Sequence, residues 1–146
     1  MNTWLLRHKA DMSLREAVLK LKEKETGDPF SRASCDFLRA IVVLHGSGWD
    51  SEVSDTMATL WSLRGDSSSD ISQYHKALKK AVESLNTQRI VSSTKKKRSI
   101  LSSSQPSDEI LHTAVDLNIL HEVLGGDRWV EKFRRDVLGY THIRFD

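Results

Sequence analysis

The chain has 146 residues, a length typical of one domain, and its 38% hydrophobic and 29% charged residues are ordinary for a soluble globular protein. Collagen-like and wholly disordered chains are therefore excluded. The longest apolar run, residues 40–44, is far shorter than the roughly 20 residues of a membrane-spanning helix. The single cysteine, Cys35, excludes an intramolecular disulfide and a zinc site made of several cysteines, and we expect it to be buried.

The net charge of +2 hides an uneven distribution along the chain. Residues 1–69 carry nine Lys or Arg against ten Asp or Glu, and residues 107–146 carry five against eight. Residues 70–106 carry eight against two, a net charge of +6. Such concentrated positive charge is typical of modules that meet phosphate backbones, and an acidic protein or membrane surface is the alternative partner.

A first helix is predicted over residues 14–25. Ser13 and Glu16 have the spacing of a capping box, in which each side chain accepts a hydrogen bond from a backbone N–H of the first turn. The apolar residues that follow share one helical face, and the turn residues at 26–29 are expected to end the helix. That apolar face must pack on this chain or on a partner.

Three more helices lead into and through the basic segment. Apolar residues at helical spacing predict a largely buried helix over residues 34–44. Asp50 is a good N-cap for the next helix, which should end near Arg64 and be followed by a gap of about five residues. Ser69 or Asp70 is expected to cap the following helix, whose apolar residues fit the 3.6-residue period over four turns.

The second half of the chain predicts a hairpin and two further helices. Two short strands, residues 89–93 and 99–103, flank the charged run 94–98, which would form the basic tip of the hairpin. Helices are predicted over residues 107–124 and 128–138, separated by two glycines. Residues 142–145 are expected to form a short strand or an ordered tail.

Three helices, the third of them basic, followed by a basic hairpin make an order that resembles winged helix-turn-helix domains, over residues 35–103. The resemblance implies a mainly α fold with a winged helix-turn-helix core at 34–104. Residues 1–33 would then be an N-terminal helix and linker, and residues 105–146 a helical extension that packs on the core or forms a dimer interface. In this family the third helix usually enters the major groove and the hairpin acts as a wing.

By this resemblance, the third helix and the wing supply the DNA-binding residues. Gln73, Lys76 and Ser72 are expected to contact base edges, because Gln pairs with adenine and Lys reaches guanine acceptors. Lys79, Arg89 and the wing would hold the phosphate backbone. The predicted set is Ser69, Ser72, Gln73, Lys76, Lys79, Lys80, Arg89, Lys95, Lys96, Lys97 and Arg98. The alternative is an amphipathic helix with a solvated cationic face, beside a solubilising hairpin tip.

The sequence favours a binding protein over an enzyme. It contains no phosphate-binding loop, dinucleotide fingerprint, nucleophile elbow or His-Glu-x-x-His helix, so no reaction and no cofactor are predicted. We expect a duplex-DNA-binding transcriptional regulator, cytoplasmic and nucleoid-associated, or nuclear in a eukaryote. The alternative is a winged-helix scaffold or adaptor subunit that binds protein partners through its outer helices.

The outer helices are candidates for a dimer interface, because small DNA readers commonly bind palindromes as two-fold dimers. The large apolar residues there are Leu117, Leu120, Leu124, Trp129, Phe133 and Val137. Packing of these residues against the first helix is the alternative. His112 and Asp116, one turn apart on the predicted helix, would bind a metal only with groups from a second chain, and no metal site is predicted.

Overall fold

The computed structural model describes residues 3–99 and 105–139, with residues 3–12 described by their backbone alone. Of the strand predicted at 99–103, only Ser99 belongs to this part of the chain. The strand or tail predicted at 142–145 also lies outside the described residues.

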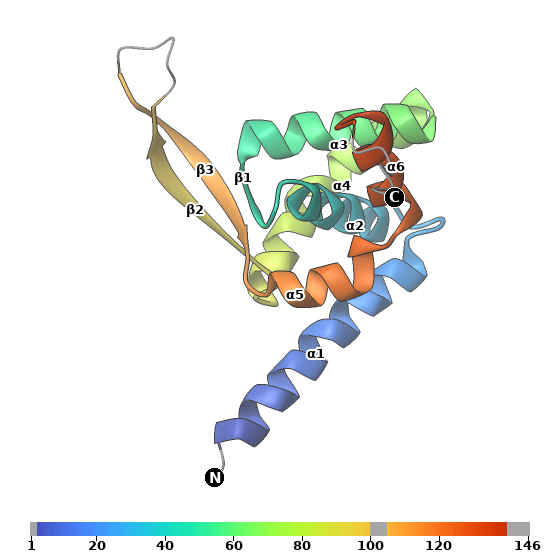
Figure 1. The fold of residues 1–146 in the computed structure, drawn as a ribbon. Coiled ribbons are helices and arrows are strands. Elements are labelled where there is room, and N and C mark those ends of the chain that lie inside the picture. Colours follow the sequence, from blue (N-terminus) through green and yellow to red (C-terminus); the bar gives the residue numbers. More distant parts are fainter. Residues whose placement is uncertain (1–2, 100–104, 140–146) are drawn as a thin grey trace, which may run out of the picture.

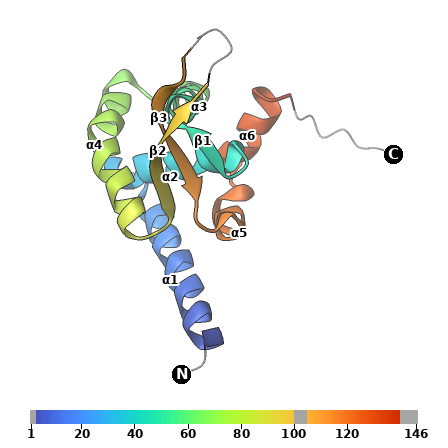
Figure 2. The same cartoon turned by 90° about the vertical axis from the view of Figure 1, so that its left-hand side faces the viewer.

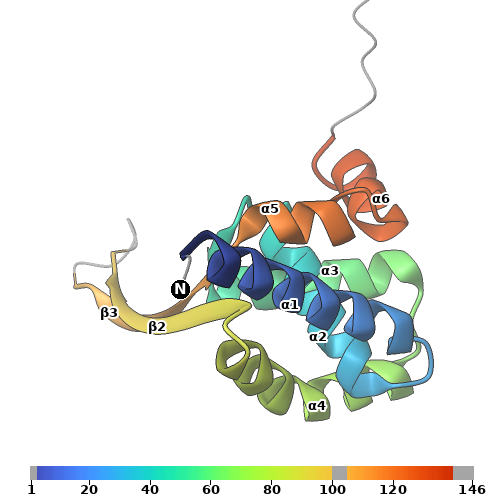
Figure 3. The same ribbon diagram turned by 90° about the horizontal axis from the view of Figure 1, so that it is seen from below.

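Helices form the body of the molecule, with α2 (Pro29–Val43) at its centre (Figure 1). The helices α1 (Thr3–Lys24), α3 (Asp50–Arg64) and α4 (Ser68–Thr87) pack against it. Every residue from 33 to 43 is buried, so α2 is covered around its whole circumference. One core around α2 therefore supports all the other elements (Figure 3).

A small antiparallel sheet projects from this body. Its strands are β1 (Ser47–Trp49), β2 (Val91–Arg98) and β3 (Ser107–Ala114), in the order β1-β3-β2. The long strands β2 and β3 form a hairpin that extends away from the helices (Figure 1). The strand β1 joins the sheet between α2 and α3 and pairs its three residues with the end of β3 nearest the body.

The C-terminal part of the chain returns to the body. The short helix α5 (Leu117–Leu120), the π-helical turn η1 (His121–Gly125) and α6 (Arg128–Asp136) lie on the side of α2 opposite α4 (Figure 2). The fold is thus mainly helical with a small sheet, as predicted at that level. No helix in the described part of the chain has the length and hydropathy needed to cross a membrane.

The first two helices begin earlier than predicted. The prediction that Ser13 caps the first helix is wrong, because α1 begins at Thr3 and Ser13 lies in its interior. Residues at 26–29 end α1 as expected, but Pro29 opens α2 rather than standing before it. Pro is favoured in the first helical turn, where its missing N–H is not needed, and Asp28 caps the helix by accepting from the backbone N–H of Phe30.

The hairpin differs from the prediction in its register. The basic run does not form the tip, since Lys95–Arg98 belong to β2 and pair with β3. The helix predicted over 107–124 is wrong in its first half, because residues 107–114 form β3 and helical structure begins only at Leu117, after the N-cap Asp116. The apolar residues of this segment fit a helical period, but pairing with β2 makes the segment a strand. The predicted boundaries at 33/34 and 104/105 accordingly fall inside α2 and inside the hairpin.

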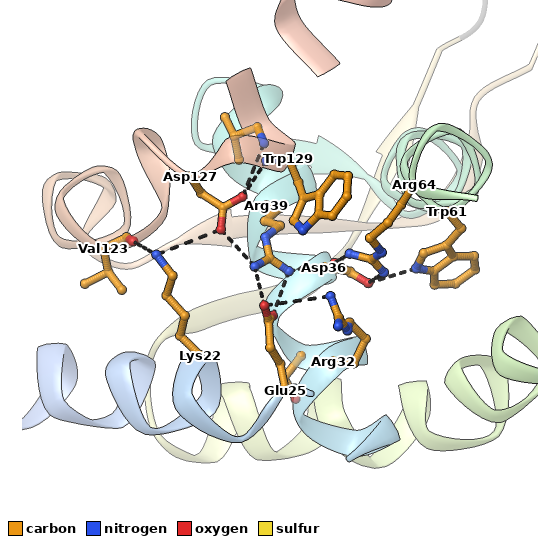
Figure 4. Close-up of polar contacts among 12 residues, drawn as sticks. Lys22, Glu25, Arg32, Asp36, Arg39, Trp61, Arg64, Val123, Asp127 and Trp129 are labelled. Carbon is orange, nitrogen blue, oxygen red and sulfur yellow. Dashed lines mark hydrogen bonds and ion pairs between the residues drawn. The ribbon is translucent and has the colours of Figure 1, made fainter. Parts of the chain in front are cut away.

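A buried cluster of charged groups joins the outer helices to α2 (Figure 4). Arg39 on α2, whose side chain is 1% exposed, donates hydrogen bonds of 2.8 Å to Asp36 and of 2.9 Å to both Glu25 and Asp127. Glu25 follows α1, and Asp127 is the N-cap of α6. A single guanidinium group therefore connects the end of α1 and the start of α6 to the central helix.

Asp36 forms the other half of this cluster. Its side chain is fully buried, and it accepts hydrogen bonds from Arg39, from both terminal nitrogens of Arg64 (2.6 and 3.0 Å), and from the indole Nε1 of Trp61 (2.9 Å). Arg64 also contacts Asp66, just after α3. The cluster thus fixes the end of α3, from which the chain enters α4.

The ionisation of Asp127 makes the stability of this cluster depend on pH. Burial disfavours the carboxylate, but the hydrogen bond and charge of Arg39 outweigh it, so the pKa of Asp127 lies below its ordinary value. Its stabilising contribution is therefore present above the unfolded pKa of about 3.9 and is lost as the pH falls through the lower folded value. We expect Asp127→Asn, which keeps an N-cap, to flatten the loss of stability below about pH 4, as measured by urea unfolding. Identical pH profiles in both proteins would contradict this assignment.

Gly46 permits the turn between α2 and β1. Its φ of +105° disfavours other residues, and a Cβ atom there would lie 3.0 Å from Cδ2 of Leu117. We expect Gly46→Ala to lower the free energy of unfolding by about 2 kcal/mol in urea titrations. Gly65→Ala is the matched control, because Gly65 also has positive φ but faces open space, and its loss should be about 1 kcal/mol. Equal losses would show that contact with Leu117 has no role.

Candidate nucleic-acid interface

The outward face of α4 is polar, and its cations lie in the middle of the helix. Tyr74, Ala81 and Leu85 are buried against the body on the opposite face. Side chains three and four residues apart share a helical face, which places the predicted contact residues on and beside one outward stripe. These exposed residues are Ser69, Ser72, Gln73, Lys76, Lys79 and Lys80. Their exposure agrees with the expectation that they lie off the apolar face of the helix.

The connection that precedes α4 is short. Only Gly65, Asp66 and Ser67 separate α3 from α4, fewer than the five residues expected, and Gly65 adopts a left-handed conformation with φ of 77°. The side chain of Ser67 caps α4 by accepting from the N–H of Asp70. A turn of three or four residues, often with Gly, is typical of helix-turn-helix motifs.

Two of the four cations on β2 are engaged by acidic residues of β3. Lys97 lies 3.2 Å from Asp108, with both side chains largely exposed. Arg98 is half-buried, contacts Glu109 at 3.1 Å and lies over the ring of Trp49. The Glu109 carboxylate also accepts from the backbone N–H and hydroxyl of Ser51, and these bonds, with Arg98, hold its pKa below the ordinary value. The basic run is thus less positive than its sequence indicates.

The remaining cations of α4, of β2 and of the turn between them are exposed and have no ion pair within the part of the chain that the structure describes. In that turn, Arg89 has a positive φ and the chain reverses its direction. Figure 2 shows α4 beside the hairpin, with α6 on the other side of the hairpin. The members of this group, called here the free cations, are Lys76, Lys79, Lys80, Arg89, Lys95 and Lys96.

A chain of polar side chains anchors the hairpin to the helices. His112 of β3, 2% exposed, lies between the hydroxyl of Ser93 (2.7 Å from Nδ1) and the carboxylate of Asp50 (2.8 Å from Nε2). Ser93 in turn accepts from the side chain of Asn86 on α4, whose carbonyl oxygen accepts from the Ser93 N–H. The edge of the Phe37 ring contacts the imidazole. This chain, which the sequence did not indicate, fixes β2 relative to α3 and α4.

The structure gives no support to a metal site at His112 and Asp116. His112 lies in a strand and Asp116 caps α5, so they do not share a helical face. Within residues 3–99 and 105–139, no group of three or more His, Cys, Asp or Glu side chains has an arrangement suited to a metal ion. Cys35 is fully buried, as predicted, and burial raises the pKa of its thiol, which disfavours the reactive thiolate.

The residues predicted for a dimer interface are largely used within the chain. Leu120, Leu124 and Phe133 are buried in the core of the chain, so these three residues pack within the molecule. Leu117 and Trp129 are half-buried against the same core. Only Val137 of this set is classed as exposed, at 43%.

Comparison with family models, curated proteins and solved structures gave no match. The surface formed by α4 and β2 has two notable features. The helix α4 follows a short helix-helix turn, and β2 belongs to the hairpin that projects from the body.

Proposed function

We propose that this protein binds duplex DNA through α4 and β2 and carries out no reaction of its own. In this proposal, α2, α3 and α4 with the β2–β3 hairpin are a winged helix-turn-helix core. The order of three helices and a hairpin, and the three-residue turn before α4, support it. The hairpin would be the wing, with its cations along the strand rather than at the tip.

The free cations are the observation that carries the proposal. Elsewhere in the described chain, Arg39 and Arg64 are buried in ion pairs and contribute nothing to an external partner. The free cations, in contrast, are exposed and carry no ion pair among the described residues, and they extend along α4, the Arg89 turn and both faces of β2. Phosphate groups of nucleic acid match such a surface, because binding releases the counterions that otherwise neutralise the duplex.

In this proposal, some of these residues contact base edges and others contact phosphates. Gln73 and Lys76, in the middle of the outward stripe of α4, have the side chains that pair with adenine and guanine edges in the major groove. Lys80, Arg89 and Lys95 would hold phosphates and position the helix. A role as a transcriptional regulator follows if the protein prefers one sequence. The proposal includes a homodimer that reads a palindrome. Of the residues predicted for the dimer interface, Val137 is exposed and would contact the second copy.

Fluorescence anisotropy with a labelled random-sequence duplex tests the proposal. We expect binding that weakens steeply between about 50 and 200 mM salt, with a slope of about 0.9 in log–log form for each phosphate contacted. A selected sequence should then bind more tightly than random duplex, and Gln73→Ala should reduce that difference. Absence of duplex binding by micromolar protein at low salt would overturn the proposal.

Lys95 and Lys97 distinguish direct contact from net charge. Lys95→Gln and Lys97→Gln change the net charge equally, but Lys97 is already engaged by Asp108. We expect Lys95→Gln to reduce the salt slope by about 0.9 and Lys97→Gln to reduce it by less than half as much, both measured by anisotropy. An unchanged slope in Lys95→Gln would contradict a phosphate contact at Lys95, and equal reductions in the two variants would show an effect of net charge alone.

A further inference from the structure

An apolar groove lies between α4, α3 and the hairpin. Its volume is about 370 Å³, within the range of pockets that bind small ligands or side chains. Val53 and Met57 of α3 form its buried floor, and the half-buried Leu78 and Val82 of α4 form one wall. Ile110 of β3 forms the facing wall and is 40% exposed.

Ile110 is the unusual residue of this groove. It is an exposed large apolar residue of the hairpin, and its cross-strand neighbour is Lys95. Alternate residues of a strand share a face, so the side chain of Lys95 lies on the groove side of the sheet with Ile110. Duplex DNA presents mainly phosphates and polar base edges, so the DNA-binding role leaves this apolar surface without a use.

The charges around the groove indicate what kind of partner it fits. Lys79 lines the groove on the α4 side, and Lys95 flanks it on the β2 side. The acidic groups that line it are Glu83, one turn after Lys79, and Asp50, whose carboxylate is engaged by His112. Asp50 is thus already engaged, whereas Lys79 and Lys95 have no ion pair among the described residues and stand on opposite sides of an apolar floor.

We propose that this groove binds an acidic peptide segment of a partner protein, with one large apolar side chain inserted between α4 and Ile110. Lys79 and Lys95 would contact carboxylates that precede and follow the inserted residue. Docking of apolar anchors into a preformed groove is a common mode of peptide recognition. Because the free cations serve both ligands, such a peptide would compete with DNA for the same face.

Selection from a display library tests this inference with the full chain. The probes are 12-residue peptides in which Asp or Glu alternates with random residues, and the tightest selected peptide is synthesised with a fluorescent label. We expect the selected peptides to share a Leu, Ile, Phe or Met between acidic residues. On titration with that peptide, the amide NMR signals of Lys79 and Ile110 should shift, while that of Val115 should not.

Matched variants decide whether the groove itself binds the peptide. Ile110→Ser should weaken binding at least tenfold, whereas Val115→Ser, at a position 55% exposed outside the groove, should leave it unchanged. Both proteins should retain the circular dichroism spectrum of the original chain. The inference is overturned if the library yields no acidic-apolar peptide, or if Ile110→Ser binds as tightly as the original. It is also overturned if Ile110→Ser weakens duplex DNA tenfold and leaves the peptide unaffected, which would assign the groove to nucleic acid.

Discussion

Replacement of Asp36 with alanine is expected to lower the free energy of unfolding by about 3–5 kcal/mol. The buried carboxylate accepts hydrogen bonds from Arg39, Arg64 and Trp61, and its removal leaves two buried guanidinium groups with too few partners. Those charges cannot be neutralised by losing a proton, because a guanidinium group stays protonated in proteins even without its acidic partner. Urea unfolding followed by circular dichroism measures the loss.

Asp55→Ala is the control for this prediction. Asp55 lies on the exposed face of α3, and its side chain has no ion pair among the described residues. Its replacement should change the free energy of unfolding by less than about 0.5 kcal/mol. If Asp36→Ala cost as little as Asp55→Ala, the carboxylate would not be the centre of the cluster.

Loss of the two lysines in the middle of α4 should produce the largest loss of DNA affinity. We expect the double variant Lys76→Gln with Lys80→Gln to bind random duplex about 10- to 100-fold more weakly and to reduce the salt slope by about 1.8. Both side chains are exposed on the outward stripe, so thermal stability should be unaffected. Anisotropy over a range of salt concentrations measures both quantities.

A matched pair on α1 separates contact from overall charge. Lys20 and Lys24 are also exposed, four residues apart on one helix, and without ion pairs in the described part of the chain. Replacing both with Gln changes the net charge by the same amount, and we expect less than a threefold change in affinity. If the α1 pair mattered as much as the α4 pair, binding would reflect net charge rather than an interface on α4.

The helices that surround α2 could be predicted because their own residues carry the signal. Apolar residues of α3 and α4 repeat every three or four positions. The predicted caps were wrong, because Asp50 is the first residue of α3 after the N-cap Trp49, and Ser67 rather than Ser69 or Asp70 caps α4. The same three- to four-residue repeat also predicted which residues of α4 are exposed. Gln73 and Lys76 were located because they lie off the apolar face.

The sheet and the buried charges could not be predicted in the same way. Ile110, Leu111 and Ala114 have spacings that fit a helix, and only pairing with β2 makes them part of a strand. The three residues of β1 are too few for a pattern. Asp36 and Arg39, three residues apart on a helix, have the spacing of a solvated surface pair, and their burial depends on Arg64 and Asp127 from distant parts of the sequence.

The position of β2 in the sheet has a consequence for self-association. Since β3 lies between β1 and β2, one side of β2 is an open edge among the described strands. Unpaired N–H and C=O groups of such an edge are a template for strand pairing between molecules, and consecutive charged residues oppose that pairing by repulsion. The cations of β2 therefore oppose aggregation at this edge, in addition to the binding role proposed for them. Removing all four together would expose an aggregation-prone edge, so single substitutions are the ones that report on binding alone.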